Sequence, residues 1–284
     1  TMDLIQAAWM IRDLGQPVSS IDLEEDSIIA GGWDGSLKMW NGDGDVLWSA
    51  QCEDRIEAII RIGELVVVTS GLHITCVKSG EILWSNALEG SADLLVFHDD
   101  KVIATSSVYD IEHGDFMESA LWQFSLDGEL IEVTRMDERP WFLHSNENLI
   151  LALGRPKCGL LVDGEHRELP STSPVMCGLS GRENILFGHA DGTISSFKGE
   201  EICKESTSIE SLTCIEQGFV AALDNGDLVA RTPNSEQIWT ASGPQVTTQS
   251  AGFDDLHWCG RWDSIRGHLE VRASSGELLV STET

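Results

Sequence analysis

Short apolar runs alternate with tight polar turns along the whole chain, and residues 27–48 show the pattern most clearly. Apolar residues predominate at 28–31, 36–40 and 46–48, and Asp-Gly or Gly-Asp-Gly sequences separate these runs. Glycine supplies the positive φ that twist-matched hairpin turns need, so the pattern predicts short antiparallel strands. A unit of this size cannot bury both of its faces, and it therefore needs neighbours of its own kind.

The second of these turns recurs along the chain. Its markers are separated by 36, 48, 36, 35, 35 and 42 positions, and a regular spacing of this length is typical of repeat proteins. Each unit has room for about four short strands, and four-stranded sheets repeated radially form a β-propeller. The sequence therefore predicts an all-β fold, a seven-bladed β-propeller of four-stranded antiparallel blades. The seven markers are Gly44, Gly80, Gly128, Gly164, Gly199, Asn234 and Gly276.

The repeat fills the chain, so we expect a single domain over residues 1–284. Apolar residues at 7–11 resemble the last strand of a unit, and we expect residues 1–15 to supply a closing strand that pairs with the final blade. Residues 277–281 compete for the same position, and the sequence leaves open which strand closes the fold. The expected blades cover about 16–51, 52–86, 87–136, 137–170, 171–206, 207–241 and 242–284.

The repeat resembles those of two known propeller families. The order of apolar strand, Asp-Gly, apolar strand, Gly-Glu and Leu-Trp is similar to the quinoprotein-like repeat, and residues 32–41 look like the end of a WD-repeat blade. The resemblance implies a propeller over nearly the whole chain, in families that carry many unrelated activities. It also suggests a quinone cofactor with calcium. The adjacent cysteines typical of such enzymes are not in this sequence, so we expect no cofactor.

Charge narrows the range of partners. The chain has 47 Asp and Glu residues against 18 Lys and Arg residues, which gives a formal net charge of −29. Such a charge repels nucleic acid and anionic membrane surfaces, so we expect neither as a direct partner. The acidity fits adaptation to high salt, and it also fits an acidic face for a basic partner. The sequence leaves both interpretations open.

The sequence favours a location in the cytoplasm. No apolar run approaches the ~18 residues of a membrane span, and no basic segment followed by an apolar stretch marks a secretory signal. The seven cysteines are scattered and form no Cys-x-x-Cys pair, which is typical of unpaired thiols in a reducing compartment.

Catalytic motifs are missing from the sequence, which has no Gly-x-Ser-x-Gly, no His-Glu-x-x-His and no phosphate loop. His113 with Asp110 and Asp115 is the best local candidate for metal or acid–base chemistry, but ordinary turn chemistry explains the same residues. The sequence thus favours a non-catalytic scaffold for protein partners, and a place in a multi-subunit complex fits this role. Two alternatives stay open: an enzyme, quinoprotein-like or hydrolase, with a site over the central channel, and a purely structural subunit.

Two units are longer than the others, and both insertions fall between the second and third strands, at 107–118 and 262–267. Insertions into repeats map to loops, often on the binding face. The first insertion holds the only tyrosine, and several Trp and Arg residues fall near the same face. Such residues dominate binding at protein interfaces. We therefore predict that protein partners bind this face through Tyr109, Asp110, His113, Trp33, Arg139, Trp141, Arg155, Trp262 and Arg266.

Overall fold

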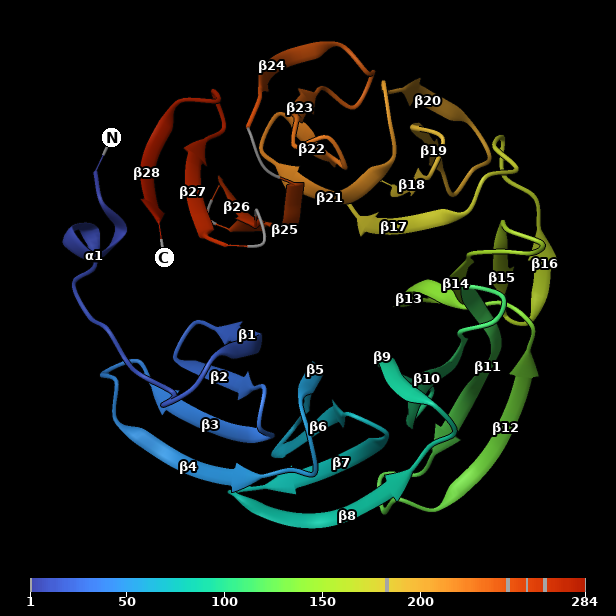
Figure 1. The fold of residues 1–284 in the computed structure, drawn as a ribbon. Coiled ribbons are helices and arrows are strands. Elements are labelled where there is room, and N and C mark those ends of the chain that lie inside the picture. Colours follow the sequence, from blue (N-terminus) through green and yellow to red (C-terminus); the bar gives the residue numbers. More distant parts are fainter. Residues whose placement is uncertain (1, 182–183, 244–245, 254, 263–264, 284) are drawn as a thin grey trace. The chain divides into compact units, whose positions relative to one another are not determined.

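The computed structural model describes residues 2–181, 184–243, 246–253, 255–262 and 265–283. Seven four-stranded sheets follow one another along the chain, and the strands of each sheet lie in sequence order (Figure 1). The protein is therefore a seven-bladed β-propeller, as the repeat predicted. Within the described residues the only helix is α1 (Leu4–Ala7), and no helix there is long and apolar enough to cross a membrane. None of the seven cysteines, all of which lie in described residues, forms a disulfide.

Residues 10–150 form one compact unit with three complete sheets and the first strand of the fourth. Its strands are β1 (Val18–Glu24), β2 (Ser27–Gly32), β3 (Ser36–Asn41), β4 (Val46–Gln51), β5 (Ile56–Ile62), β6 (Leu65–Ser70), β7 (His73–Lys78), β8 (Glu81–Ala87), β9 (Ser91–His98), β10 (Lys101–Asp110), β11 (Asp115–Phe124), β12 (Leu130–Met136) and β13 (Pro140–Ser145). Strands β1, β5 and β9 lie side by side at one edge of this unit, and β4, β8 and β12 lie at the opposite edge (Figure 1).

Residues 1–9 and 151–284 form the second compact unit, and the division falls within β14. The strands from there to the C-terminus are β14 (Leu149–Leu153), β15 (Leu160–Val162), β16 (Glu165–Arg167), β17 (Val175–Ser180), β18 (Ile185–His189), β19 (Thr193–Ser196), β20 (Glu201–Lys204), β21 (Ile209–Ile215), β22 (Gly218–Leu223), β23 (Leu228–Arg231), β24 (Gln237–Ala241), β25 (Val246–Phe253), β26 (Leu256–Trp262), β27 (Gly267–Ala273) and β28 (Leu278–Glu283). Every pairing whose register is described here is antiparallel, apart from one isolated bridge.

The N-terminal segment differs from the closing strand predicted for residues 1–15. Residues 4–7 form α1, because the side chain of Asp3 accepts the N–H of Ile5 at 2.9 Å and caps a helical turn. A single parallel bridge joins Met2 to Val280 in β28, and β28 itself is the last strand of the seventh sheet. The final blade thus takes its outermost strand from the C-terminal end of the chain.

The recurring turn glycines provide space as well as positive φ. Gly128 has a φ of 82°, and a Cβ atom placed there would lie 2.5 Å from the ring of Trp84. That ring, on the outermost strand of the preceding sheet, also donates its N–H to the carbonyl of Leu126 at 2.9 Å. In the second unit the ring of Trp239 covers Gly276 in the same way. In both places the outer Trp packs on the turn of the next sheet, and a side chain larger than glycine would not fit beneath the ring.

Aspartates that precede glycine hold the other turns, as predicted. Asp34 and Asp191 each accept the backbone N–H two residues further on, at 2.8 and 3.0 Å. Hydrogen bonds from Ser36 lower the pKa of Asp34. At the sixth turn the sequence predicts Asn234 as the residue with positive φ. In the structure the positive φ, 69°, belongs to the next residue, Ser235.

The inserted residues 107–118 form strands and not the predicted loop. The β10–β11 ladder continues through Tyr109 paired with Phe116 and Asp110 paired with Asp115, which leaves only residues 111–114 as a turn. Val, Tyr, Phe and Met side chains favour extended backbone, and the side chain of Asp110 closes the turn by accepting the N–H of Glu112 at 2.8 Å. The insertion is therefore a hydrogen-bonded hairpin. The 262–267 connection joins β26 to β27, and residues 263–264 lie outside the described residues.

Candidate binding site

The β10–β11 hairpin and the segments that precede β5, β9 and β13 lie at the same end of their sheets. In a four-stranded antiparallel sheet the first strand begins where the second ends and the third begins. The β2–β3 turn with Trp33 therefore lies at the end where β5 begins after Arg55, and β13 begins after Arg139 at the equivalent point. We call this end of residues 10–150 the hairpin end.

A cavity of about 690 Å³ lies at the hairpin end. Its walls come from the β2–β3 turn, the beginnings of β5 and β9, and the segment before β13. The aromatic and charged residues of its lining are Trp33, Asp54, Arg55, Glu57, Asp93 and Arg139. Two of the predicted binding residues, Trp33 and Arg139, are thus brought together here.

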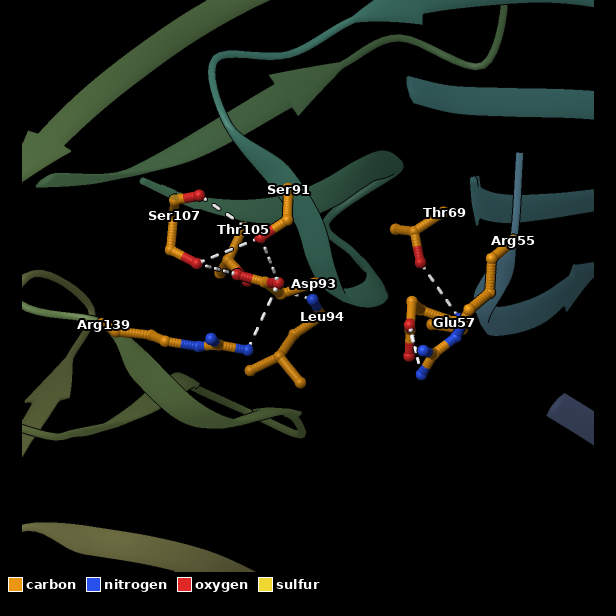
Figure 2. A network of polar contacts seen from close by, with 10 residues as sticks. Arg55, Glu57, Thr69, Ser91, Asp93, Leu94, Thr105, Ser107 and Arg139 are labelled. Carbon is orange, nitrogen blue, oxygen red and sulfur yellow. Dashed lines mark hydrogen bonds and ion pairs between the residues drawn. The ribbon is translucent and has the colours of Figure 1, made fainter. Parts of the chain in front are cut away.

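β-Bulges place two of the carboxylates on this cavity. The register of β5 with β6 skips a residue at Glu57, and the register of β9 with β10 is interrupted at the equivalent position, Asp93. The N–H of the residue after each acid donates to a threonine hydroxyl of the neighbouring strand, Thr69 or Thr105, at 3.0 Å in both cases (Figure 2). A bulge re-aims the side chain that it carries, so the two innermost strands present an acid at the same level.

Asp93 and Arg139 form a largely buried ion pair. Arg139 Nη2 lies 3.3 Å from Asp93 Oδ1, and the side chains are 9% exposed for Asp93 and 19% for Arg139. The hydroxyls of Ser91 and Ser107 also donate to the Asp93 carboxylate (Figure 2). Burial raises the pKa of Asp93 and lowers the pKa of Arg139, so the loss of water around both charges outweighs their attraction.

The guanidinium of Arg139 also lies between two aromatic rings. Its carbon is 4.0 Å from the ring centre of Phe116 on the hairpin and 4.2 Å from that of Trp141 in β13. Tyr109 contacts Phe116 edge to face, with 5.1 Å between ring centres. Such cation–π contacts are worth up to about 2 kcal/mol when the cation is shielded from water. This stack fixes the base of the hairpin against β13, and Tyr109, Arg139 and Trp141 of the prediction belong to it.

A second ion pair lines the cavity. Arg55 Nη2 lies 2.6 Å from Glu57 Oε1, and the Arg55 guanidinium lies 4.1 Å from the ring centre of Trp33. Burial raises the pKa of Glu57, and the negative charge of Asp93 raises it further, whereas the two arginines lower it. The negative charge of Glu57 is therefore only partly balanced in this environment.

Asp110 and His113 stabilise the exposed turn of the hairpin. His113 Nδ1 lies 3.0 Å from Asp110 Oδ2, and the hydrogen bond from this ring lowers the pKa of Asp110. Asp115 accepts the N–H of Phe116 at 2.8 Å. Within the described residues no three His, Cys, Asp or Glu side chains are grouped as metal ligands would be.

The other three predicted residues belong to the second compact unit. Arg155 follows β14, and Trp262 is the half-exposed last residue of β26. Arg266 lies just before β27, and its Nη1 is 3.5 Å from a carboxylate oxygen of Glu283.

Sequence reasoning missed Arg55, Glu57, Asp93 and Phe116. The missed signal is an acidic residue near the beginning of an otherwise apolar innermost strand. It recurs as Glu210, which occupies the bulge of β21 in the second unit.

Comparisons with known proteins show the fold alone. No family model matches the chain, and no curated protein matches it. Among solved structures it is similar to BamB from Moraxella catarrhalis, with 14% identity, 97% of this chain and 87% of that chain covered, and a TM-score of 0.74. For Sqt1 from Saccharomyces cerevisiae the identity is 10%, the coverage 94% and 85%, and the TM-score 0.71. For the computationally designed Ika8 protein these values are 16%, 94% and 87%, and 0.67.

Proposed function

We propose that this protein is a non-catalytic scaffold that binds partner proteins through the hairpin end, with the 262–267 connection as a further contact. The β10–β11 hairpin supports the proposal, because it exposes apolar side chains where a hairpin in water would carry polar ones. Tyr109, Ile111 and Met117 are 52%, 88% and 44% exposed. Apolar surface gathered on one projecting element is typical of a protein interaction site.

The fixed base of the hairpin also suits a binding role. A flexible loop loses conformational freedom when a partner binds it, and this loss weakens the complex. The hairpin keeps its ladder hydrogen bonds, and the Arg139 stack holds Phe116 against Trp141. The exposed side chains are therefore presented in a nearly fixed geometry, so little order has to be gained on binding.

Replacing Tyr109 or Ile111 with alanine is expected to weaken partner binding while the fold stays intact. Both side chains are more than half exposed and contribute little to the core. A residue at the centre of an interface typically costs on the order of 2 kcal/mol when truncated, about a thirtyfold loss of affinity. Partners captured from native extract are identified by mass spectrometry, and their affinity for each variant is then measured.

Matched substitutions at the other end of the sheets are the control. Asp43→Ala and Asp127→Ala change exposed turns between third and fourth strands, and they should leave capture unchanged. If these substitutions abolish capture while Tyr109→Ala and Ile111→Ala bind normally, the partner does not use the hairpin end.

One observation favours a purely structural subunit as the second candidate. Each outermost strand of the first unit carries, within its first three residues, two adjacent aliphatic side chains that are 45–54% exposed. These pairs are Val46-Leu47, Ile82-Leu83 and Leu130-Ile131. A subunit packed by its outer edge would bury them, so Leu83→Ser would then abolish assembly and Tyr109→Ala would not.

A further inference from the structure

The cavity at the hairpin end has the size of a ligand-binding site. Its volume of about 690 Å³ lies within the usual range for ligand sites, roughly 300–1,000 Å³, and is larger than a single side chain fills. Ala58, Ala92 and Leu94 supply apolar wall. The methylene groups of a long basic side chain pack well on such surface while the charged head reaches a polar partner.

The charges around the cavity favour a cationic occupant. Three carboxylates, of Asp54, Glu57 and Asp93, line it together with two guanidinium groups. Arg55 and Arg139 are already paired with acids, at 2.6 and 3.3 Å, and both are stacked on aromatic rings. An anion would have to compete with these carboxylates, and the net charge of −29 repels it at longer range. A cation would relieve the surplus negative charge.

We infer that this cavity binds a basic peptide segment of the partner protein, with an arginine or lysine side chain of that segment placed between Glu57 and Asp93. The inference rests on the proposed function, because it names the chemistry of the partner at the hairpin end. The two β-bulges favour a cationic side chain over other ligands, since they turn the carboxylates of Glu57 and Asp93 toward the same cavity.

The test uses a blocked hexapeptide of alternating arginine and glycine, and calorimetry at physiological salt with the full chain. Glu57→Gln removes one charge from the cavity and should weaken binding of the peptide by about tenfold or more. Glu25→Gln removes the same charge from the exposed β1–β2 turn at the other end of the sheet and should change affinity less than about twofold. Melting temperatures of both variants confirm that the chain is folded.

A second variant tests the sign of the effect. Arg55→Gln removes the cation paired with Glu57, and it should strengthen binding of the basic peptide several-fold. The alternating glutamate and glycine hexapeptide should not bind the wild-type protein. Three results would each overturn the inference. The first is that the wild-type protein binds the glutamate peptide more tightly than the arginine peptide. The second is that Arg55→Gln binds the arginine peptide more weakly than the wild type does, and the third is that Glu57→Gln and Glu25→Gln lose equal affinity for it. If partner capture still depends on Tyr109 in that case, the proposed function stands and only the cavity assignment fails.

Discussion

Replacing Arg139 with alanine is expected to lower the free energy of unfolding by about 3 kcal/mol, because it leaves the Asp93 carboxylate buried without its cation. Asp93 is only 9% exposed, and burial already raises its pKa despite the pair. The substitution also removes the guanidinium from between Phe116 and Trp141. The base of the hairpin should therefore loosen as the free energy of unfolding falls. Urea unfolding of the full chain measures this fall.

Two comparisons show whether the loss of stability comes from the buried ion pair or from the loss of any arginine charge. Arg135 and Glu89 form an exposed pair in the same unit, so Arg135→Ala should lower the free energy of unfolding far less than Arg139→Ala does. The double variant Asp93→Ala/Arg139→Ala should lose less stability than the two single variants together, since neither charge is then left alone. Equal losses for Arg135→Ala and Arg139→Ala would contradict the structural role of the buried pair.

Lowering the pH is expected to destabilise the second unit through His257. Burial, together with the positive charges of Arg272 and Arg261, lowers the pKa of this fully buried ring from 6.5 to about 4. The unfolded chain therefore takes up the proton more readily than the folded chain. The contribution of the neutral His257 ring to the free energy of unfolding is fully present above pH 6.5. It is lost as the pH falls toward about 4, and the loss is at most roughly 3 kcal/mol.

The measurement is the urea midpoint as a function of pH for the wild type and for His257→Phe. Phenylalanine keeps a ring beside Trp239, whose centre lies 6.3 Å away, and it cannot take up a proton. The variant should lose the part of the pH dependence that falls between 6.5 and about 4. Identical profiles for the wild type and His257→Phe would contradict the assignment.

The fold could be predicted because its unit repeats. Each turn needs a residue with positive φ, and the rings of Trp84 and Trp239 each lie on a turn glycine of the next sheet, Gly128 and Gly276, so glycine recurs in these turns. The hairpin length could not be predicted from the same signal. Residues 107–118 mix apolar and polar side chains, and their strand pairing depends on partners across the ladder and on the Arg139 stack.

Only part of the candidate site could be predicted from the sequence, because the rest depends on how the strands pair. Trp33, Tyr109, Arg139 and Trp141 were suggested by their residue types and by their positions at strand ends. Glu57 and Asp93 were not, because an acid in an innermost strand faces the cavity only when a bulge turns it there. The bulge is a property of the paired strands and of a threonine hydroxyl on the neighbouring strand.

The most direct test of the central claim is photo-crosslinking from single positions in the intact protein. A photoreactive phenylalanine derivative at Ile111, the most exposed apolar residue of the hairpin, should crosslink to the partner protein in native extract. The same group at Asp43, in an exposed turn at the other end of the sheets, should not. A crosslink from position 43 and none from position 111 would contradict binding at the hairpin end.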